Sequence, residues 1–174
     1  MDRFKQIETF ASVAAKGSLS AAAQAEGIAP AVIGRRLDAL EERLSDGRRY
    51  LLGDRLTEAD VRLFTTLVRF DAVYHNHFRC NRNKLAEMPA LWRYARRLFQ
   101  APGFGNTVDF DHIKRHYYQV HTGINPTAVV PLGPDLAGWL TPHHREELGG
   151  RPFGDGTPPG PVPAGEEVPV TGRP

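Results

Sequence analysis

Apolar residues at helical spacing divide the first 44 residues into three short helices. The first, over residues 4–16, has an apolar side chain at every third position and ends at a glycine. Ser18 can cap a second, alanine-rich helix. The third begins near Pro30, with leucines on one face and Arg35 and Arg36 exposed. Short helices joined by a glycine-containing turn predict a helix-turn-helix.

Three further amphipathic helices are expected between residues 57 and 121. Thr57 can cap the first, and Asp60 can reach back to it or favour the positive helix end. The second follows Pro89, and the third starts near Asp109 and runs to about His121. The apolar face of the first of these helices comprises Val61, Phe64, Thr65, Leu67, Val68 and Phe70. The pattern predicts an all-α chain.

Composition divides the chain at its C-terminal end and limits its class. Residues 154–174 are rich in proline and glycine, so we expect a disordered or extended spacer there, with recognition by a proline-binding domain as the alternative. The net charge of +2 provides no chain-wide field for nucleic acid. No apolar stretch approaches the roughly 20 residues of a membrane span, and no secretion signal is expected. A single cysteine, Cys80, excludes an internal disulfide and fits a reducing cytoplasm.

The sequence of residues 1–44 closely resembles the start of LysR-type transcriptional regulators. It reads MDRFKQIETFASVAAKGSLSAAAQAEGIAPAVIGRRLDALEERL. The resemblance implies that residues 29–36 contact DNA and that two serines contact phosphates. The implied DNA-binding residues are Ser18, Ser20, Pro30, Ala31, Arg35 and Arg36. The sequence departs from the family after residue 44, where a two-stranded wing and a dimerising helix are expected but missing. Residues 35 and 36 therefore also fit a solvated helix face.

A second resemblance covers residues 45 to about 153. RRYLLGDRLTEADVRLFTTLVRFDAVYHNHFRCN, followed by MPALWRYARRLFQAPGFGNTVDFDHIKRHYYQVHTGINPTAVVPLGP, is similar to the C-terminal helical domain of glutathionyl-hydroquinone reductases, the Xi class of glutathione transferases. The resemblance implies a glutathione S-transferase C-terminal-like bundle, preceded here by the truncated helix-turn-helix of residues 1–44 and followed by the tail.

The reductase resemblance also implies a chemistry. The family uses glutathione as cosubstrate and a thioredoxin-like domain whose cysteine attacks a glutathione-conjugated quinol; we expect that domain and its Cys-Pro motif to be absent here. The helical domain supplies tyrosines that hold the aromatic substrate, and Tyr74 and Tyr117 stand at two such positions. The alternative is that both are half-buried packing residues. The family pairs through its helical domains, so a homodimer is implied.

Other candidate groups carry weaker signals. Arg79 and Arg82 could lower the pKa of Cys80, yet it matches a cysteine of the helical domain rather than the nucleophile, so no catalytic residue is expected. His112 and His116 lie one helical turn apart but lack the further ligands of a zinc site, so no metal is expected.

The segment LDALEERL fits both families, so one helix over residues 31–44 can belong to either pattern. We expect the N-terminal helices to pack where the first helix of the reductase domain is missing. Three interpretations stay open: a glutathione transferase-like protein that keeps the quinone-binding half and is weak or inactive alone, a LysR-type DNA-binding fragment, or a remnant of a fusion or misjoined reading frame without activity.

Overall fold

The computed structural model describes residues 30–145, and the expectations for residues 1–29 and for the tail lie outside this range. Four α-helices form its frame: α3 (Pro30–Ser45), α4 (Glu58–Arg69), α5 (Pro89–Phe99) and α6 (Phe110–Val120). Short helical turns lie between them, η1 (Phe70–Tyr74), η2 (Leu85–Glu87) and η3 (Gly105–Thr107), and η4 (Ala137–Leu140) follows α6. Within the described residues there is no strand, only a single bridge between Tyr50 and Gly53. The all-α prediction is confirmed.

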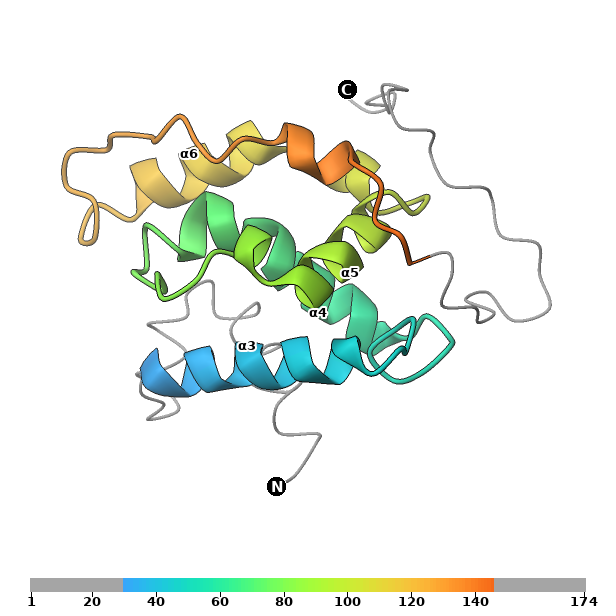
Figure 1. The fold of residues 1–174 in the computed structure, drawn as a ribbon. Helices are drawn as coiled ribbons and strands as arrows, with labels where there is room; N and C mark the ends of the chain where they lie inside the picture. Colours follow the sequence, from blue (N-terminus) through green and yellow to red (C-terminus); the bar gives the residue numbers. More distant parts are fainter. Residues whose placement is uncertain (1–29, 146–174) are drawn as a thin grey trace.

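The helices are arranged in layers, with α4 and α5 between α3 and α6 (Figure 1). The face of α3 that carries Leu37, Leu40 and Leu44 is buried against this bundle and packs on α5. The carboxylate of Glu41 accepts hydrogen bonds from the amides of Ala90 and Leu91, at 2.8 and 2.7 Å. Since Met88, the residue before α5, has no polar side chain, α3 supplies the cap that α5 lacks.

Asp60 fixes the start of α4. Its carboxylate reaches back to the amide of Thr57, at 2.8 Å, as the sequence predicts. The other carboxylate oxygen accepts from the amide of Leu51 and from the hydroxyl of Tyr94, at 2.9 and 2.8 Å. Asp60 has no exposed surface, so these donors replace the water it would otherwise bind. One carboxylate thereby joins α4, α5 and the preceding loop.

The end of α4 widens into a π-helical turn, η1, which the sequence does not predict. This turn buries Phe70, Val73 and Tyr74, and it also carries the half-buried Asp71. The Asp71 carboxylate accepts from the amide of Leu85 at 2.6 Å and from that of Ala86 at 3.2 Å. A side chain in η1 therefore caps η2, and this holds the intervening loop against the bundle.

The chain returns across α5 after α6. Trp139, in η4, is buried and lies edge-on to Trp92, with ring centroids 4.8 Å apart. Gln100 donates to the carbonyl of Trp139 at 2.9 Å. Arg145, also buried, donates to the carbonyls of Arg48 and Arg49. Residues 137–145 thus tie the loop before α4 to the far side of α5.

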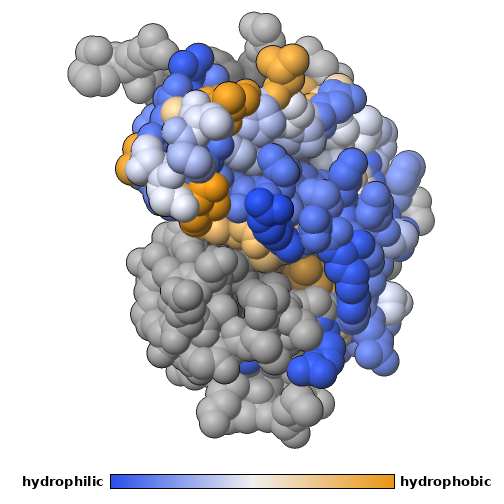
Figure 2. Space-filling view, turned by 90° about the vertical axis from the view of Figure 1, so that its left-hand side faces the viewer, coloured by the Kyte–Doolittle hydropathy of each residue, from blue (hydrophilic) through white to orange (hydrophobic). Residues whose placement is uncertain are grey.

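Exposed apolar side chains gather near the end of α6 and in the segment that follows it. Ile124, Val129 and Leu132 are exposed, Leu132 almost completely, at 97%. Figure 2 views the molecule from this end and shows apolar residues separated by polar ones. Among residues 30–145, no helix is long and apolar enough to cross a membrane.

Candidate functional site

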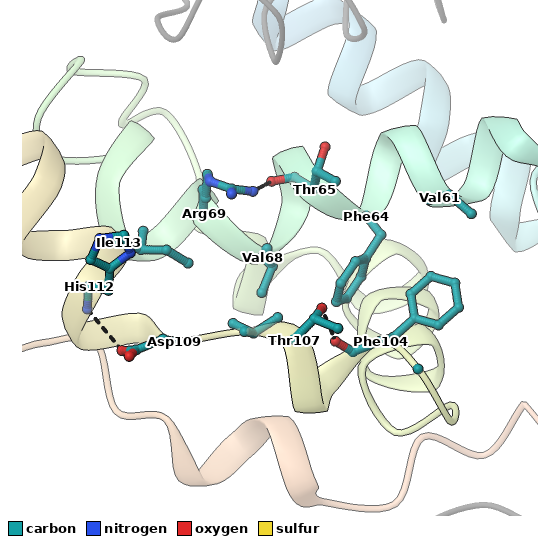
Figure 3. A pocket seen from close by; sticks show the side chains of 12 residues that line it. Val61, Phe64, Thr65, Val68, Arg69, Phe104, Thr107, Asp109, His112 and Ile113 are labelled. Carbon is teal, nitrogen blue, oxygen red and sulfur yellow. Dashed lines mark hydrogen bonds between the residues drawn. The ribbon is translucent and has the colours of Figure 1, made fainter. Parts of the chain in front are cut away.

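A cavity of about 430 Å³ lies between α4, α6 and the segment that joins α5 to α6 (Figure 3). Phe64 and Val68 project into it from α4, and Phe104 and Val108 come from the joining segment. The rings of Phe64 and Phe104 meet edge to face, with centroids 5.1 Å apart. Ile113 of α6 completes the apolar lining. Small-molecule sites fall in about this range of volume and are lined in this way.

Val61 stands at the rim of this cavity. The sequence places Val61 on the apolar face of α4, and the structure leaves this residue 44% exposed. Its neighbours on the helix, Phe64 and Val68, are buried as predicted. The periodicity identifies the apolar stripe correctly, but part of that stripe lines the cavity instead of the core.

Polar groups stand at the α6 end of the cavity. Arg69 lies on the last turn of α4 and donates to the carbonyl of Thr65, at 2.5 Å. Asp109 caps α6 by accepting from the amide of His112, at 2.9 Å. The Asp109 carboxylate is thereby directed at the helix start, where the positive end of the helix stabilises it. The cavity thus combines apolar walls with a cation at one end.

The structure brings Tyr74 and Tyr117 together. Tyr74 ends η1, Tyr117 lies on α6, and their rings meet edge to face with centroids 6.1 Å apart. Both are buried, with 1% and 8% of their surface exposed. Burial and the neighbouring Tyr117 raise the pKa of Tyr74 far above its ordinary value, so its hydroxyl keeps its proton and can donate a hydrogen bond.

This tyrosine pair does not line the cavity. It lies beyond the end of the cavity that is formed by Arg69 and Ile113. Ile113, which lines the cavity, precedes Tyr117 by one helical turn. Arg69, also in the lining, is close enough to Tyr74 for its charge to oppose the rise in the pKa of that hydroxyl. The pair and the cavity are therefore adjacent parts of one region.

Two histidines contact Tyr117 of this pair, and the sequence did not single out the contact between them. His77 Nε2 and His121 Nδ1 are 3.4 Å apart, and both rings stand edge-on to Tyr117. Burial lowers the pKa of both histidines, and each is lowered further by a neighbouring histidine, His77 by His121 and His121 by His116. Within residues 30–145 no group of three or more His, Cys, Asp or Glu side chains could hold a metal ion.

Cys80 stands close to this region as a protonated thiol. Its amide donates to the carbonyl of Tyr74, at 3.1 Å, and its sulfur lies 3.7 Å from the carbonyl of Phe78. Burial raises the pKa of Cys80 to about 11. The expectation that Arg79 and Arg82 lower it is wrong, because desolvation prevails and Arg82 is turned to Asp38 of α3.

The DNA-contacting residues implied by the LysR resemblance are described only in part. Ser18 and Ser20 lie outside the described residues. Pro30 and Ala31 open α3, and farther along this helix Arg35 is exposed and Arg36 half-buried. Nothing in the described part of α3 favours DNA binding.

Comparison with known proteins identifies the fold. The family model described as "Glutathione S-transferase, C-terminal domain" matches residues 22–97. The match starts before the first described residue and includes α3, α4 and most of α5. The described residues have the fold of a glutathione S-transferase C-terminal helical domain.

Similar proteins narrow the resemblance to one class. The chain is 53% identical over 98 residues to glutathionyl-hydroquinone reductase PcpF of Sphingobium chlorophenolicum, a match that covers 56% of this chain and 31% of that protein. The structure of a glutathione transferase from Gordonia bronchialis aligns with 61% identity and a TM-score of 0.75, over 95% of this chain and 50% of that one. A Xi-class transferase from Natrialba magadii aligns with 49% identity and a TM-score of 0.67, over 70% and 38%.

The chain therefore resembles glutathionyl-hydroquinone reductases and Xi-class glutathione transferases, as the sequence indicates. It spans about a third of the curated relative and about half or less of the two solved ones. The LysR resemblance of residues 1–44 finds no support among these matches.

Proposed function

We propose that this helical domain binds a hydroquinone-type aromatic molecule, as the substrate-holding part of a glutathionyl-hydroquinone reductase-like protein. The ring would occupy the cavity between α4 and α6, with one oxygen directed past Ile113 and Arg69 toward Tyr74 and Tyr117, whose hydroxyls would donate hydrogen bonds to it. The observation that carries the proposal is the meeting of these two tyrosines next to an apolar cavity of about 430 Å³.

The physical requirements of such a ligand agree with this region. An aromatic ring gains free energy by leaving water for apolar and aromatic walls, and the Phe64–Phe104 pair offers an edge-to-face partner. A quinol oxygen then needs a donor, because a buried unpaired oxygen is costly. The hydroxyl of Tyr74 stays protonated at neutral pH, since burial raises its pKa.

Glutathione is the cosubstrate implied by the resemblance, and Cys80, the one cysteine of the chain, is poorly suited to accept it from a conjugate. This transfer needs a thiolate as the acceptor. The thiol of Cys80 is half-buried and its pKa is raised to about 11, so little thiolate forms at neutral pH. We therefore propose that residues 30–145 bind the aromatic part of the conjugate, and we assign none of them to the transfer of glutathione.

Calorimetric titration of the 174-residue chain with hydroquinone under reducing conditions tests this function. Tyr74→Phe and Tyr117→Phe should each weaken binding about fivefold, the value of one lost hydrogen bond of about 1 kcal/mol. Tyr50→Phe serves as the control, since Tyr50 is buried in the loop before α4 and has no ring contact with Tyr74 or Tyr117 and no place in the cavity lining. Equal affinity of all four proteins would refute the role of the pair, and absence of binding would refute the function.

A further inference from the structure

The charges around the cavity are unequal. Arg69 is half-buried, and no carboxylate of the described residues forms an ion pair with it. The one carboxylate in the lining, Asp109, is engaged with the start of α6. Among the described residues the guanidinium of Arg69 donates to one acceptor, the carbonyl of Thr65, so further N–H donors are available to a ligand.

The separation of Arg69 from the aromatic wall of the cavity is similar to the length of a small aromatic ligand. Phe64 and Arg69 are five residues apart on α4, which separates their backbone positions by about 7.5 Å along the helix. Val68 lies between them and keeps the wall apolar. A benzene ring with one charged substituent opposite a hydroxyl is of similar length.

We propose that the cavity selects aromatic molecules that carry one negative charge, with the ring against Phe64 and Phe104 and the anionic group on Arg69. The inference rests on the proposed use of this cavity and specifies the ligand further. A neutral hydroquinone makes no use of the cation. An aromatic carboxylate or an acidic phenol forms a charge-assisted hydrogen bond with it, in a setting partly shielded from water.

The test is a titration at pH 7 with two probes of the same shape, 4-hydroxybenzoate and its neutral amide, 4-hydroxybenzamide. The chain should bind the acid about tenfold more tightly, since a hydrogen bond to a charged group contributes about 1.5 kcal/mol or more. Arg69→Gln should abolish this difference and Arg69→Lys should keep part of it.

Arg62→Gln is the matched control. Arg62 lies on the same helix, but it is exposed, paired with Glu58 and outside the cavity lining. This variant should keep the full preference for the acid, and circular dichroism should show that each variant is folded. Equal affinity for acid and amide, or a preference that survives Arg69→Gln, would overturn the inference.

The outcomes separate the inference from the function beneath it. If hydroquinone and 4-hydroxybenzamide bind in the cavity and 4-hydroxybenzoate binds no more tightly than the benzamide, selection by charge is refuted and aromatic binding stands. If no probe binds, both fail. If the acid binds but perturbs amide resonances only at arginines outside the cavity, such as Arg93 and Arg96 of α5, the preference is surface ion binding and the inference is wrong.

Discussion

The buried side chain of Asp60 joins several elements of the fold through hydrogen bonds. Its carboxylate accepts from two backbone amides and from the hydroxyl of Tyr94 with no surface exposed. Such a group is stabilising only while every partner is present, because each buried donor left without an acceptor costs about 1–3 kcal/mol.

Asp60→Ala should therefore lower the free energy of unfolding by about 3 kcal/mol or more, measured by urea denaturation. Tyr94→Phe removes one donor and keeps the carboxylate, so its cost should be smaller, about 1–2 kcal/mol. A loss below about 1 kcal/mol in the alanine variant would contradict the role given to Asp60.

Some of the proposed functional residues could be predicted from the sequence, and others could not. Tyr74 and Tyr117 could be singled out because the sequence around them resembles that of glutathionyl-hydroquinone reductases. Their burial, and the contact of Tyr117 with Tyr74 and His77, could not, because Tyr117 lies about 40 positions from both and meets them only through packing of η1 on α6. Arg69 gave no local signal at all, since a basic residue on the last turn of a helix is ordinary.

At the scale of elements, local signals predicted the helices well. Proline at the start of α3 and α5, the Thr57–Asp60 cap of α4 and Asp109 before α6 each mark a boundary within a residue or two. The π-helical turn and the return of residues 137–145 were missed. Both depend on distant partners: Asp71 with Leu85, and Trp139 with Trp92.

The turn between α5 and α6 shapes the cavity, and Gly105 sets how closely it packs. A Cβ atom at Gly105 would lie 2.4 Å from the carbonyl oxygen of Phe99, closer than atoms approach without a backbone shift. Gly105→Ala should lower the free energy of unfolding by about 1–3 kcal/mol in urea denaturation, and weaken ligand binding through displacement of Phe104.

Gly123→Ala provides the comparison, because a Cβ atom there would meet nothing within 4 Å. Its unfolding free energy should stay within about 0.5 kcal/mol of the parent. If the two alanine variants are equally stable, the close approach of the turn to α5 does not constrain the cavity.

Across the whole molecule, the His77–His121 contact makes stability depend on pH. The folded state lowers the pKa of both histidines below their ordinary value of 6.5, mainly by burial. The unfolded chain therefore binds more protons once the pH falls below about 6.5. Stability from these groups is complete above that pH and decreases as the pH falls toward the lowered values.

Urea denaturation at pH 7.5 and 5.5 measures this effect. The free energy of unfolding should be lower at pH 5.5, and His77→Asn should reduce the difference by removing one titrating group. His144→Asn, which changes an exposed histidine, should leave it unchanged. Identical stability of the parent at the two pH values would contradict the account of this contact.

The whole fold also changes how α3 is understood. The helix that resembles part of a DNA-binding element buries Leu37, Leu40 and Leu44 in the bundle and caps α5 through Glu41. Residues 30–45 therefore belong in the described structure to a transferase-type helical domain, in which they pack on α5.

The most direct measurement is the change in backbone amide resonances of the ¹⁵N-labelled chain on titration with hydroquinone. Shifts should concentrate in residues 61–69, 103–109 and 112–117, which form the cavity and its α6 end, and should spare the exposed face of α3. Shifts elsewhere, or none at millimolar hydroquinone, would contradict the claim that this helical domain holds an aromatic ligand.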